Sequence, residues 1–331
     1  PSHQQEITEQ YFMANSPQTS QAVQFIDIRA DQAGQRIDNF LITLEKGVPK
    51  SRIYRALRKG EVRVNKGRIK QTYRLQAGDQ VRVPPLRVSE KVIISELSES
   101  LSTALQQSII LEDDELLVIN KPWGLAVHAG SQIQLGIIEA MRLLRPQCAF
   151  LELVHRLDRD TSGCLVMTKS RAALLNLQQQ MKDSETDKRY LTLTRGHWPA
   201  RQNVVELALQ KNALSSGERM VVPDVNGKKS KTLFEVKQDF TDCQLVMAKL
   251  FTGRTHQIRV HSASQSHPVA GDEKYGDREF NKRLKQAGLK RMFLHAWQLS
   301  LRHPQTDELI TFSAELPAAL NAVLLQLEKS S

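Results

Sequence analysis

The sequence predicts a two-domain α+β protein, in which a small basic domain precedes a larger domain built on a mainly antiparallel β-sheet with flanking helices. The chain has 331 residues, more than one average domain. Basic charge is concentrated before residue 89, and short apolar runs of strand length alternate with helical stretches after residue 108. These three observations favour two structural units of different composition.

Composition excludes several classes of protein. Hydrophobic residues make up 40% of the chain, but no run of about 18 apolar residues occurs that could cross a membrane. The first residues lack the basic and apolar pattern of a signal peptide. The three cysteines, Cys148, Cys164 and Cys243, form no C-x-x-C pair, which argues against a disulfide framework and a zinc knuckle. We therefore expect a cytoplasmic monomer that uses no membrane and no metal.

The net charge of +10 is unevenly distributed along the chain. Residues 22 to 88 contain 15 basic and 6 acidic residues, whereas residues 1 to 21 contain no Lys or Arg. Clustered Lys and Arg are the usual contacts to nucleic-acid phosphates. The segment is therefore predicted to bind nucleic acid, with a merely solvated basic face as the alternative.

Residues 1 to 24 are rich in Gln, Ser, Thr and Asn, so we expect them to be disordered. Helical spacing of apolar residues from Arg36 to Leu44 then predicts a first helix. A second helix is expected from the N-cap Ser51 to Lys59, with Gly60 at its left-handed end.

The second helix places Arg52, Arg55 and Lys59 along one side. After it, alternation at 62 to 64 and the turn Asn65-Lys66-Gly67 predict a hairpin whose second strand is 68 to 70. A last strand follows at 81 to 83, and residues 86 to 107 read as a linker with a short helix near 97 to 107.

The second domain is expected from residue 108 to residue 331. Apolar runs predict its strands, and helical spacing predicts a helix at Ala172 to Met181. The strands are expected at 109 to 111, 116 to 119, 164 to 167, 190 to 194, 245 to 250 and 299 to 301.

Two polar segments of this domain could carry chemistry. HRLDRDTSG, at 155 to 163, lies between two apolar strands, where Gly163 permits a sharp turn. GRTHQIRVH, at 253 to 261, follows the apolar run that ends at Phe251. The histidines at 256, 261 and 267 do not have the spacing of a helical zinc motif, and no nucleotide-binding glycine pattern occurs. Taken alone, the first segment could equally be a surface loop containing ion pairs.

Residues 34 to 83 resemble the S-four-type domain, a small RNA-binding module first described in a ribosomal small-subunit protein. The resemblance rests on the basic helix, the VRVNKGRI hairpin and the closing LQAGDQVRV. It implies a domain at 25 to 85 that contacts structured RNA. The candidate RNA contacts are Arg52, Arg55, Lys59, Arg63 and Lys66.

Five motifs in order resemble those of the pseudouridine synthases that act on large-subunit ribosomal RNA. They are NKPWGLAVH at 120 to 128, HRLDRDTSG at 155 to 163, KRY at 188 to 190, GRTHQIRVH at 253 to 261 and LHA at 294 to 296. The resemblance covers the chain from residue 25 onward. It implies the pseudouridine synthase fold, an isomerase without a cofactor, and large-subunit (23S) ribosomal RNA or a ribosome assembly intermediate as the partner.

The same resemblance implies roles for four residues. Asp158 matches the essential catalytic carboxylate, and Arg254 matches the arginine that pairs with it. Tyr190 matches the aromatic residue that stacks on the target base, and Arg156 matches the residue that holds the flipped-out nucleotide or fills its place. Whether Asp158 acts as a nucleophile or as a base stays open.

Two other functions remain possible from the sequence. One is an RNA-binding assembly factor whose second domain has lost catalysis. The other is an RNA nuclease that uses His155 or His256 as acid and base. An RNA assay separates them, because only the isomerase changes a uridine without changing the length or mass of the RNA.

Overall fold

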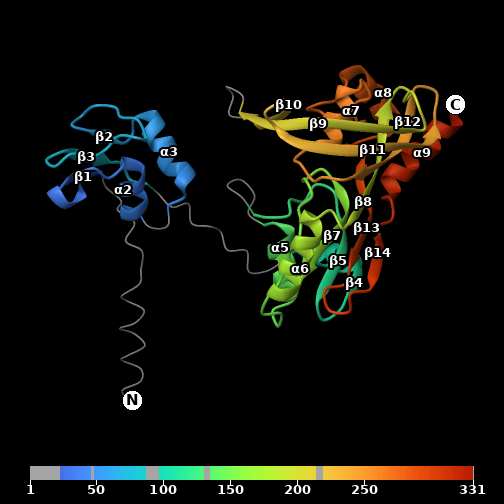
Figure 1. The fold of residues 1–331 in the computed structure, drawn as a ribbon, viewed down its shortest axis with the longest axis horizontal. Coiled ribbons are helices and arrows are strands. Elements are labelled where there is room, and N and C mark those ends of the chain that lie inside the picture. Colours follow the sequence, from blue (N-terminus) through green and yellow to red (C-terminus); the bar gives the residue numbers. More distant parts are fainter. Residues whose placement is uncertain (1–22, 46–47, 87–96, 130–134, 214–218, 331) are drawn as a thin grey trace, which may run out of the picture. The chain divides into compact units, whose positions relative to one another are not determined.

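The computed structural model describes residues 23–45, 48–86, 97–129, 135–213 and 219–330 and divides into two compact units, residues 1–92 and 93–331 (Figure 1). The expected disordered segment falls on residues outside this description, except at its end, where a strand begins at Gln24. Most of the expected linker is also outside it. At the start of the expected linker, Leu86 is buried in the core of the first unit. Within its second half, a helix of the second unit begins at Glu99.

The first unit is a three-stranded antiparallel sheet packed with two helices. Its core is formed by apolar side chains of both helices and all three strands or their flanks, including Ile37, Ile53 and Val81. The sheet order is β1-β3-β2. The elements are β1 (Gln24–Asp27), the 3-10 helix η1 (Ala30–Gln32), α2 (Ile37–Leu44), α3 (Lys50–Lys59), β2 (Arg63–Val64) and β3 (Gln80–Val83).

Two details of the first unit differ from the sequence expectation. Helix α3 begins at Lys50 with Pro49, not Ser51, at its N-cap, because the fixed φ of proline already suits a helix start. The expected strand 68 to 70 does not form. Instead Asn65 exchanges backbone and side-chain hydrogen bonds with Gln80, so β2 pairs with β3. The turn at 65 to 67 and the left-handed Gly60 are as predicted.

The second unit is built on one eleven-stranded sheet. Nine strands follow the order β10-β9-β11-β12-β8-β13-β7-β5-β4; in addition, β14 pairs with β13 and β6 pairs with β7. The strands run as β4 (Ile109–Glu112), β5 (Leu116–Lys121), β6 (Glu152–Leu153), β7 (Ser162–Thr168), β8 (Asp187–Arg195), β9 (Gln202–Ala213), β10 (Arg219–Pro223), β11 (Lys228–Asp239), β12 (Cys243–Leu250), β13 (Leu294–Arg302) and β14 (Leu309–Ser313). The mainly antiparallel α+β prediction is therefore confirmed.

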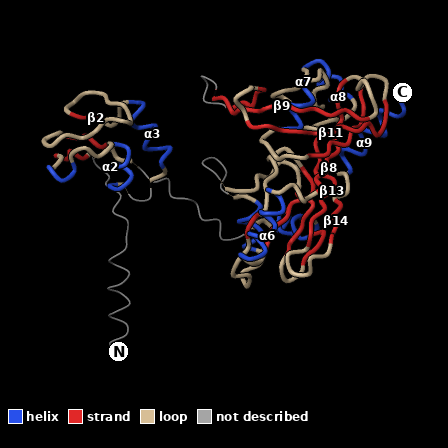
Figure 2. The backbone as a smooth tube through the Cα atoms, in the orientation of Figure 1, coloured by secondary structure: helices blue, strands red, loops and turns tan. Residues whose placement is uncertain are grey.

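Helices pack along this sheet, as the tube in Figure 2 shows. They are α4 (Glu99–Gln107), α5 (Ile137–Leu143), α6 (Arg171–Lys182), α7 (Gln257–Ser264), α8 (Arg278–Gln286) and α9 (Ala318–Lys329). Helix α5 shares a core with β5 and β7, α6 contacts β7 and β13, and α7 contacts β9, β10 and β11. In the described part of the chain, no helix is long and apolar enough to span a membrane.

The pairing of β7 with β13 is parallel, while every other strand pair described is antiparallel. The two strands meet at Ser162 with His295 and at Gly163 with Ala296. Gly163 has φ of 115°, and a Cβ there would overlap the backbone of Ala296, so only glycine fits. This contact brings the HRLDRDTSG loop next to the LHA motif.

His295 has a structural role at this junction. Its Nε2 donates to the Ala314 carbonyl at 3.0 Å, so its Nδ1 accepts from the Ser162 hydroxyl at 2.8 Å. Ser162 in turn accepts from Arg291 at 2.9 Å. Burial lowers the pKa of His295 to about 4, which keeps the ring neutral and this chain of hydrogen bonds intact near pH 7.

One ion-pair cluster of the second unit predicts a measurable pH dependence. Arg145 and Lys169 contact Glu112 at 2.6 and 2.9 Å, and the hydrogen bond from Arg145 is the main cause that lowers the pKa of Glu112 to about 2. The stabilisation is therefore present above pH about 4.5 and is lost as the pH falls towards 2.

We expect Glu112→Gln to lower the free energy of unfolding by about 1–2 kcal/mol at pH 7, since the Glu112 side chain is 31% exposed and partly screened. The loss should shrink between pH 4.5 and 2. All three tryptophans lie in residues 93–331, so tryptophan fluorescence during urea unfolding measures this unit alone. Glu308→Gln, at an exposed position, is the control, and an equal effect of both variants would contradict the prediction.

Candidate active site

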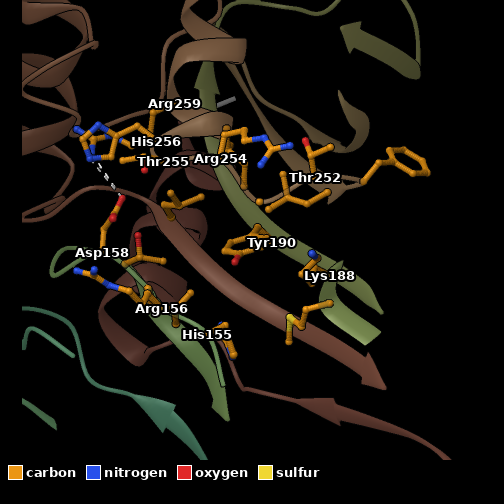
Figure 3. A pocket seen from close by; sticks show the side chains of 18 of the residues that line it. His155, Arg156, Asp158, Lys188, Tyr190, Thr252, Arg254, Thr255, His256 and Arg259 are labelled. Carbon is orange, nitrogen blue, oxygen red and sulfur yellow. Dashed lines mark ion pairs between the residues drawn. The ribbon is translucent and has the colours of Figure 1, made fainter. Parts of the chain in front are cut away.

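A cavity of about 890 Å³ opens where three parts of the second unit meet. It is lined by the loop 154–158 before β7, by β8, and by the loop 251–256 between β12 and α7, among others (Figure 3). Six Lys and Arg side chains line it, and Asp158 is the one carboxylate among its described lining residues. The cavity is therefore suited to a polyanionic substrate and presents a single acidic group to it.

The chain around Asp158 is fixed by its own backbone. Leu157 before it and Thr161 after it are buried, and the Thr161 amide donates to the Asp158 carbonyl at 3.1 Å, which closes a turn. The side chain of Asp158 points into the cavity and is 42% exposed. Both carboxylate oxygens are thus accessible to a bound molecule.

Lys121, the last residue of β5, holds the same loop through hydrogen bonds of its side chain. Its fully buried ammonium donates to the carbonyls of Pro122, Leu125 and Arg159, at 3.0, 2.8 and 3.2 Å. Burial, and next the charge of Arg291, lower the pKa of Lys121 to about 7. Lys121 therefore holds the residue that follows Asp158.

Two side chains of the GRTHQIRVH segment face Asp158. His256 Nε2 lies 3.6 Å and Arg259 Nη1 lies 3.9 Å from the same carboxylate oxygen. These separations are ion-pair contacts rather than direct hydrogen bonds. The carboxylate therefore has a compensating cation nearby while its lone pairs stay free.

Arg259 is held rigidly by a second carboxylate. Its guanidinium makes a bidentate pair with buried Asp272, at 2.7 and 2.8 Å, and lies over the ring of Tyr275. Burial alone would lower the pKa of Arg259, but the hydrogen bond and charge of Asp272, and then the charge of Asp158, raise it. Arg259 is a permanent cation at this site.

The hydrogen bonds around His256 define where its ring proton lies. Tyr275 Oη accepts from the Val221 amide at 2.9 Å, so its own proton can be donated to His256 Nδ1, also at 2.9 Å. Burial, followed by the charge of Arg259, lowers the pKa of His256, which favours the neutral ring. The remaining ring proton is then on Nε2 and faces Asp158.

The predicted pair between Asp158 and Arg254 is wrong, because Arg259 occupies that place. Arg254 lies in the exposed loop before α7, where its amide donates to Gln257 and its Nε donates to the Lys229 carbonyl at 3.3 Å. It still lines the cavity. Sequence reasoning missed Arg259 because no helix was expected here. Helix α7 begins at Gln257. His256 and Arg259, which are three residues apart, therefore lie on the same side of its first turn.

Tyr190 is in the middle of the sheet and lines the cavity. On β8 it lies between Ala248 of β12 and Ala296 of β13, whose small side chains leave room around its ring. Burial, and then the charge of Asp158, raise the pKa of Tyr190, so it is a neutral phenol near pH 7. The structure therefore brings Tyr190 and Asp158 to one cavity, as the sequence predicted.

Arg156 also lies at this cavity, close to Asp158 in Figure 3, with an exposed side chain. Lys188, two residues before Tyr190 on the same face of β8, lines it too, although sequence reasoning gave it no role. Burial lowers the pKa of Lys188. The alternation of side chains along a strand was the signal that could have identified Lys188.

The histidines of the two motifs serve separate purposes. His155 Nε2 accepts from the Val166 amide at 3.1 Å, and burial lowers its pKa to about 4. His261 bonds to the Ser230 hydroxyl, and His267 bonds to the Arg195 carbonyl. In the described parts of the chain, no group of three or more His, Cys, Asp or Glu side chains is arranged to hold a metal ion.

The candidate RNA contacts of the first unit differ in their freedom. Arg52 pairs with Glu61 at 2.8 Å, and Arg63 donates to the Gly60 carbonyl at 3.2 Å. Arg55, Lys59 and Lys66 are exposed, and none makes an ion pair with another described residue. The exposed cations are the ones available for phosphates.

Comparison with known families gives two matches. The family model of RNA pseudouridylate synthase matches residues 115–264, and that of the S4 domain matches residues 35–81. Ribosomal large subunit pseudouridine synthase C from Haemophilus influenzae is 50% identical over 93% of this chain and 96% of its own length. The protein of the same name from Escherichia coli K12 is 50% identical over 93% and 98%.

Solved structures give the same result for the second unit. Human RNA pseudouridylate synthase domain containing 4 superposes with a TM-score of 0.57 at 28% identity, over 69% of this chain and 96% of that one. Human RNA pseudouridylate synthase domain containing 1 superposes with a TM-score of 0.53 at 27% identity, over 63% and 83%.

Proposed function

The chain belongs to the RNA pseudouridylate synthase family and is a uridine-to-pseudouridine isomerase, and we propose that it modifies large-subunit (23S) ribosomal RNA with Asp158 as its essential carboxylate. The observation that carries the assignment of the site is the cavity itself. It places one accessible carboxylate and the ring of Tyr190 among six cations. The proposed substrate is free ribosomal RNA or an assembly intermediate. We further propose that the enzyme acts as a monomer in the cytoplasm.

The reaction rearranges bonds within one nucleotide. The bond from uracil N1 to ribose C1′ breaks, the base turns, and C5 bonds to C1′ instead. C5 loses its hydrogen and N1 gains one, so the product is an isomer and no redox partner or water is consumed. The enzyme must therefore hold a detached base, exclude water and supply one group that reacts at the sugar or takes up a proton.

Asp158 has the position for that group. Its oxygens are unobstructed, and Arg259 and the Nε2 proton of His256 compensate its charge from one side. The carboxylate lies at the edge of the cavity, where it can act as a nucleophile at a carbon or as a base at the ribose. Either route needs the same ionised oxygen.

Tyr190 suits the second requirement, because its ring offers a flat apolar surface for uracil inside the cavity. As a neutral phenol it can donate or accept a hydrogen bond but does not act as a phenolate base. We propose that Tyr190 stacks on the base while the base turns.

The cations suit the extrusion of the nucleotide from the RNA. We propose that Arg156 holds the flipped nucleotide or fills its place, and that Arg254, on the exposed loop, contacts a phosphate at the cavity mouth rather than Asp158. A target uridine in structured RNA must leave its stack before the carboxylate can reach it.

The geometry disfavours the two rival functions. A nuclease needs one protonated and one neutral imidazole, but burial lowers the pKa of both His155 and His256. An inactive assembly factor would not need an accessible carboxylate beside a fixed arginine, whereas this site has Asp158 beside Arg259. We therefore favour the isomerase.

Incubation of large-subunit ribosomal RNA with the protein tests this function. The isomerase yields uridine sites that keep a carbodiimide adduct after alkali, while the RNA retains its length and mass. Shortened RNA would support the nuclease, and unchanged RNA would support the inactive factor.

The first unit is proposed to supply affinity through its exposed cations. We expect Arg55→Gln with Lys59→Gln to lower the slope of log affinity against log salt by about 1.4–1.8 units, since each lost phosphate contact contributes roughly 0.7–0.9. The control is Arg29→Gln, whose side chain already pairs with Asp31 and is not among the candidate RNA contacts. Filter binding at several salt concentrations measures both slopes. Equal slopes would mean that the basic residues of the first unit are only solvated and do not contact RNA.

A further inference from the structure

We propose that a second cavity, next to the catalytic one, binds the single-stranded RNA that flanks the target uridine. We call it the flanking-strand pocket. It measures about 1140 Å³ and is bounded by Trp123, Arg159, Arg259, Arg291 and the basic face of helix α8. The proposal rests on the proposed function, because it extends the substrate site of that same reaction.

The pocket continues from the active site. Arg259 lines both cavities, with its guanidinium between Asp158 and Asp272. The catalytic turn lies between them as well, since Asp158 lines the first cavity while Arg159 and Asp160 line the second. A nucleotide joined covalently to a uridine at Asp158 therefore leaves the first cavity beside the second.

The charge of the flanking-strand pocket matches a phosphate chain. Eight Lys and Arg side chains line it against three carboxylates, of which Asp272 is already paired with Arg259 and Asp160 with Arg159. Arg278, Lys282 and Lys285 follow at i, i+4 and i+7 on α8, so they share one face of the helix. Phe280 and Leu284 on the opposite face are buried in the core, which fixes the orientation of this row.

The cations of this row are available to a ligand. Arg278, Lys282, Lys285 and nearby Lys290 are exposed, and none of them makes an ion pair with a carboxylate among the residues that the structure describes. Unpaired cations on a concave surface are costly to bring together unless an anion binds there. A run of phosphates provides such anions at regular spacing.

Trp123 adds a feature that phosphate binding alone does not need. Its side chain is 46% exposed, and the Arg291 guanidinium lies 5.7 Å from its ring centroid. Arg291 is itself fixed by hydrogen bonds to the Ser162 hydroxyl and to the carbonyls of Asp160, Met292 and Leu294. An exposed aromatic ring beside a fixed guanidinium is the arrangement on which an unstacked base lies in single-stranded nucleic acid.

These features favour RNA over an acidic protein segment. Carboxylates of a peptide would satisfy the lysines, but they would leave the open ring of Trp123 without a partner of its own shape. A nucleotide supplies both a phosphate and a flat base, separated by one sugar.

The test compares two variants of the full chain with a matched control. Trp123→Leu removes the ring, and Lys282→Gln with Lys285→Gln removes two cations. Arg171→Gln with Lys329→Gln changes the net charge equally at exposed positions that line neither cavity. Thermal unfolding of each variant is measured first, and similar unfolding temperatures show that the comparison is between folded proteins.

On large-subunit ribosomal RNA, we expect Trp123→Leu to raise KM roughly 5- to 160-fold, the range for loss of one stacked base, with kcat within about threefold. The lysine pair should lower the salt slope of binding by about 1.4–1.8 units, and the control should change neither quantity. A KM and a salt slope equal to those of the control would overturn the proposal.

Binding of a uridine dodecamer tests the pocket without catalysis. We expect the dodecamer to quench tryptophan fluorescence in the wild type and not in Trp123→Leu. Trp198 is buried, Trp297 lines neither cavity, and Trp123 is the exposed ring of this pocket. Equal quenching in both proteins would contradict the stacking role. If the wild type formed no pseudouridine but showed this quenching, the proposed function would fail while the pocket would stand. Loss of poly-glutamate binding in the lysine pair, with RNA binding unchanged, would overturn the proposal in favour of an acidic protein partner.

Discussion

Asp158→Asn is expected to lower the rate of pseudouridine formation by at least about 10³-fold, because an amide is neither a nucleophile nor a base at neutral pH. The variant should fold and bind RNA like the wild type. The Asp158 carboxylate makes no close hydrogen bond with the described residues. The turn around it is held by hydrogen bonds from the backbone amides of Thr161 and Gly124 and from the Lys121 ammonium. Single-turnover assays on large-subunit ribosomal RNA, together with filter binding, measure the two properties separately.

Asp160→Asn is the matched control for this variant. Asp160 is two residues away, is 52% exposed, and contacts only the neighbouring Arg159 by ion pair, at 3.5 Å. The turn is closed by the carbonyl of Asp158, not by the side chain of Asp160. Activity should stay within about tenfold of the wild type, since an exposed ion pair contributes under about 1 kcal/mol. Equal activity of Asp158→Asn and the wild type would remove the catalytic assignment.

The sequence predicted the strands that are apolar throughout and missed those that alternate with polar residues. Strands β5 and β7 are buried on both faces, so their residues form continuous apolar runs. Strand β11 buries Ser230 and Thr232 beside Phe234 and Val236, because the Ser230 hydroxyl is satisfied by Leu207 and His261. Such a strand has no apolar run, and only its pairing with β9 and β12 makes it evident.

The sequence indicated the site residues that belong to one short loop motif. It was wrong about the arginine that pairs with Asp158, because that choice depends on where helix α7 begins. Asp158 and Tyr190 reach the cavity because β7 and β8 both pair with β13. The choice between Arg254 and Arg259 depends on where α7 begins, and the left-handed His256 before Gln257 sets that start. Neither apolar spacing nor residue type signals a left-handed histidine. The second cavity depends on folding α8 against the loop after β5, which lies more than 150 residues earlier in the chain.

Arg259→Met is expected to lower kcat by about 10²–10³-fold, the usual cost of removing a fixed charge from an active site. The variant has a structural consequence too, since Asp272 would be left as a buried carboxylate without its bidentate partner. Breaking a buried pair in this way costs about 3–5 kcal/mol of stability.

A double variant, Arg259→Met with Asp272→Asn, separates the two effects. It removes the buried unpaired charge, so most of the lost stability should return, whereas the activity should not recover. If Arg259 acted only by holding Asp272, activity would recover along with stability. Arg254→Met completes the comparison, because it should raise KM for ribosomal RNA while kcat and the pH profile stay as in the wild type. A loss of kcat in Arg254→Met, with kcat retained in the double variant, would reverse the two roles and show that Asp158 depends on the exposed loop rather than on the first turn of α7.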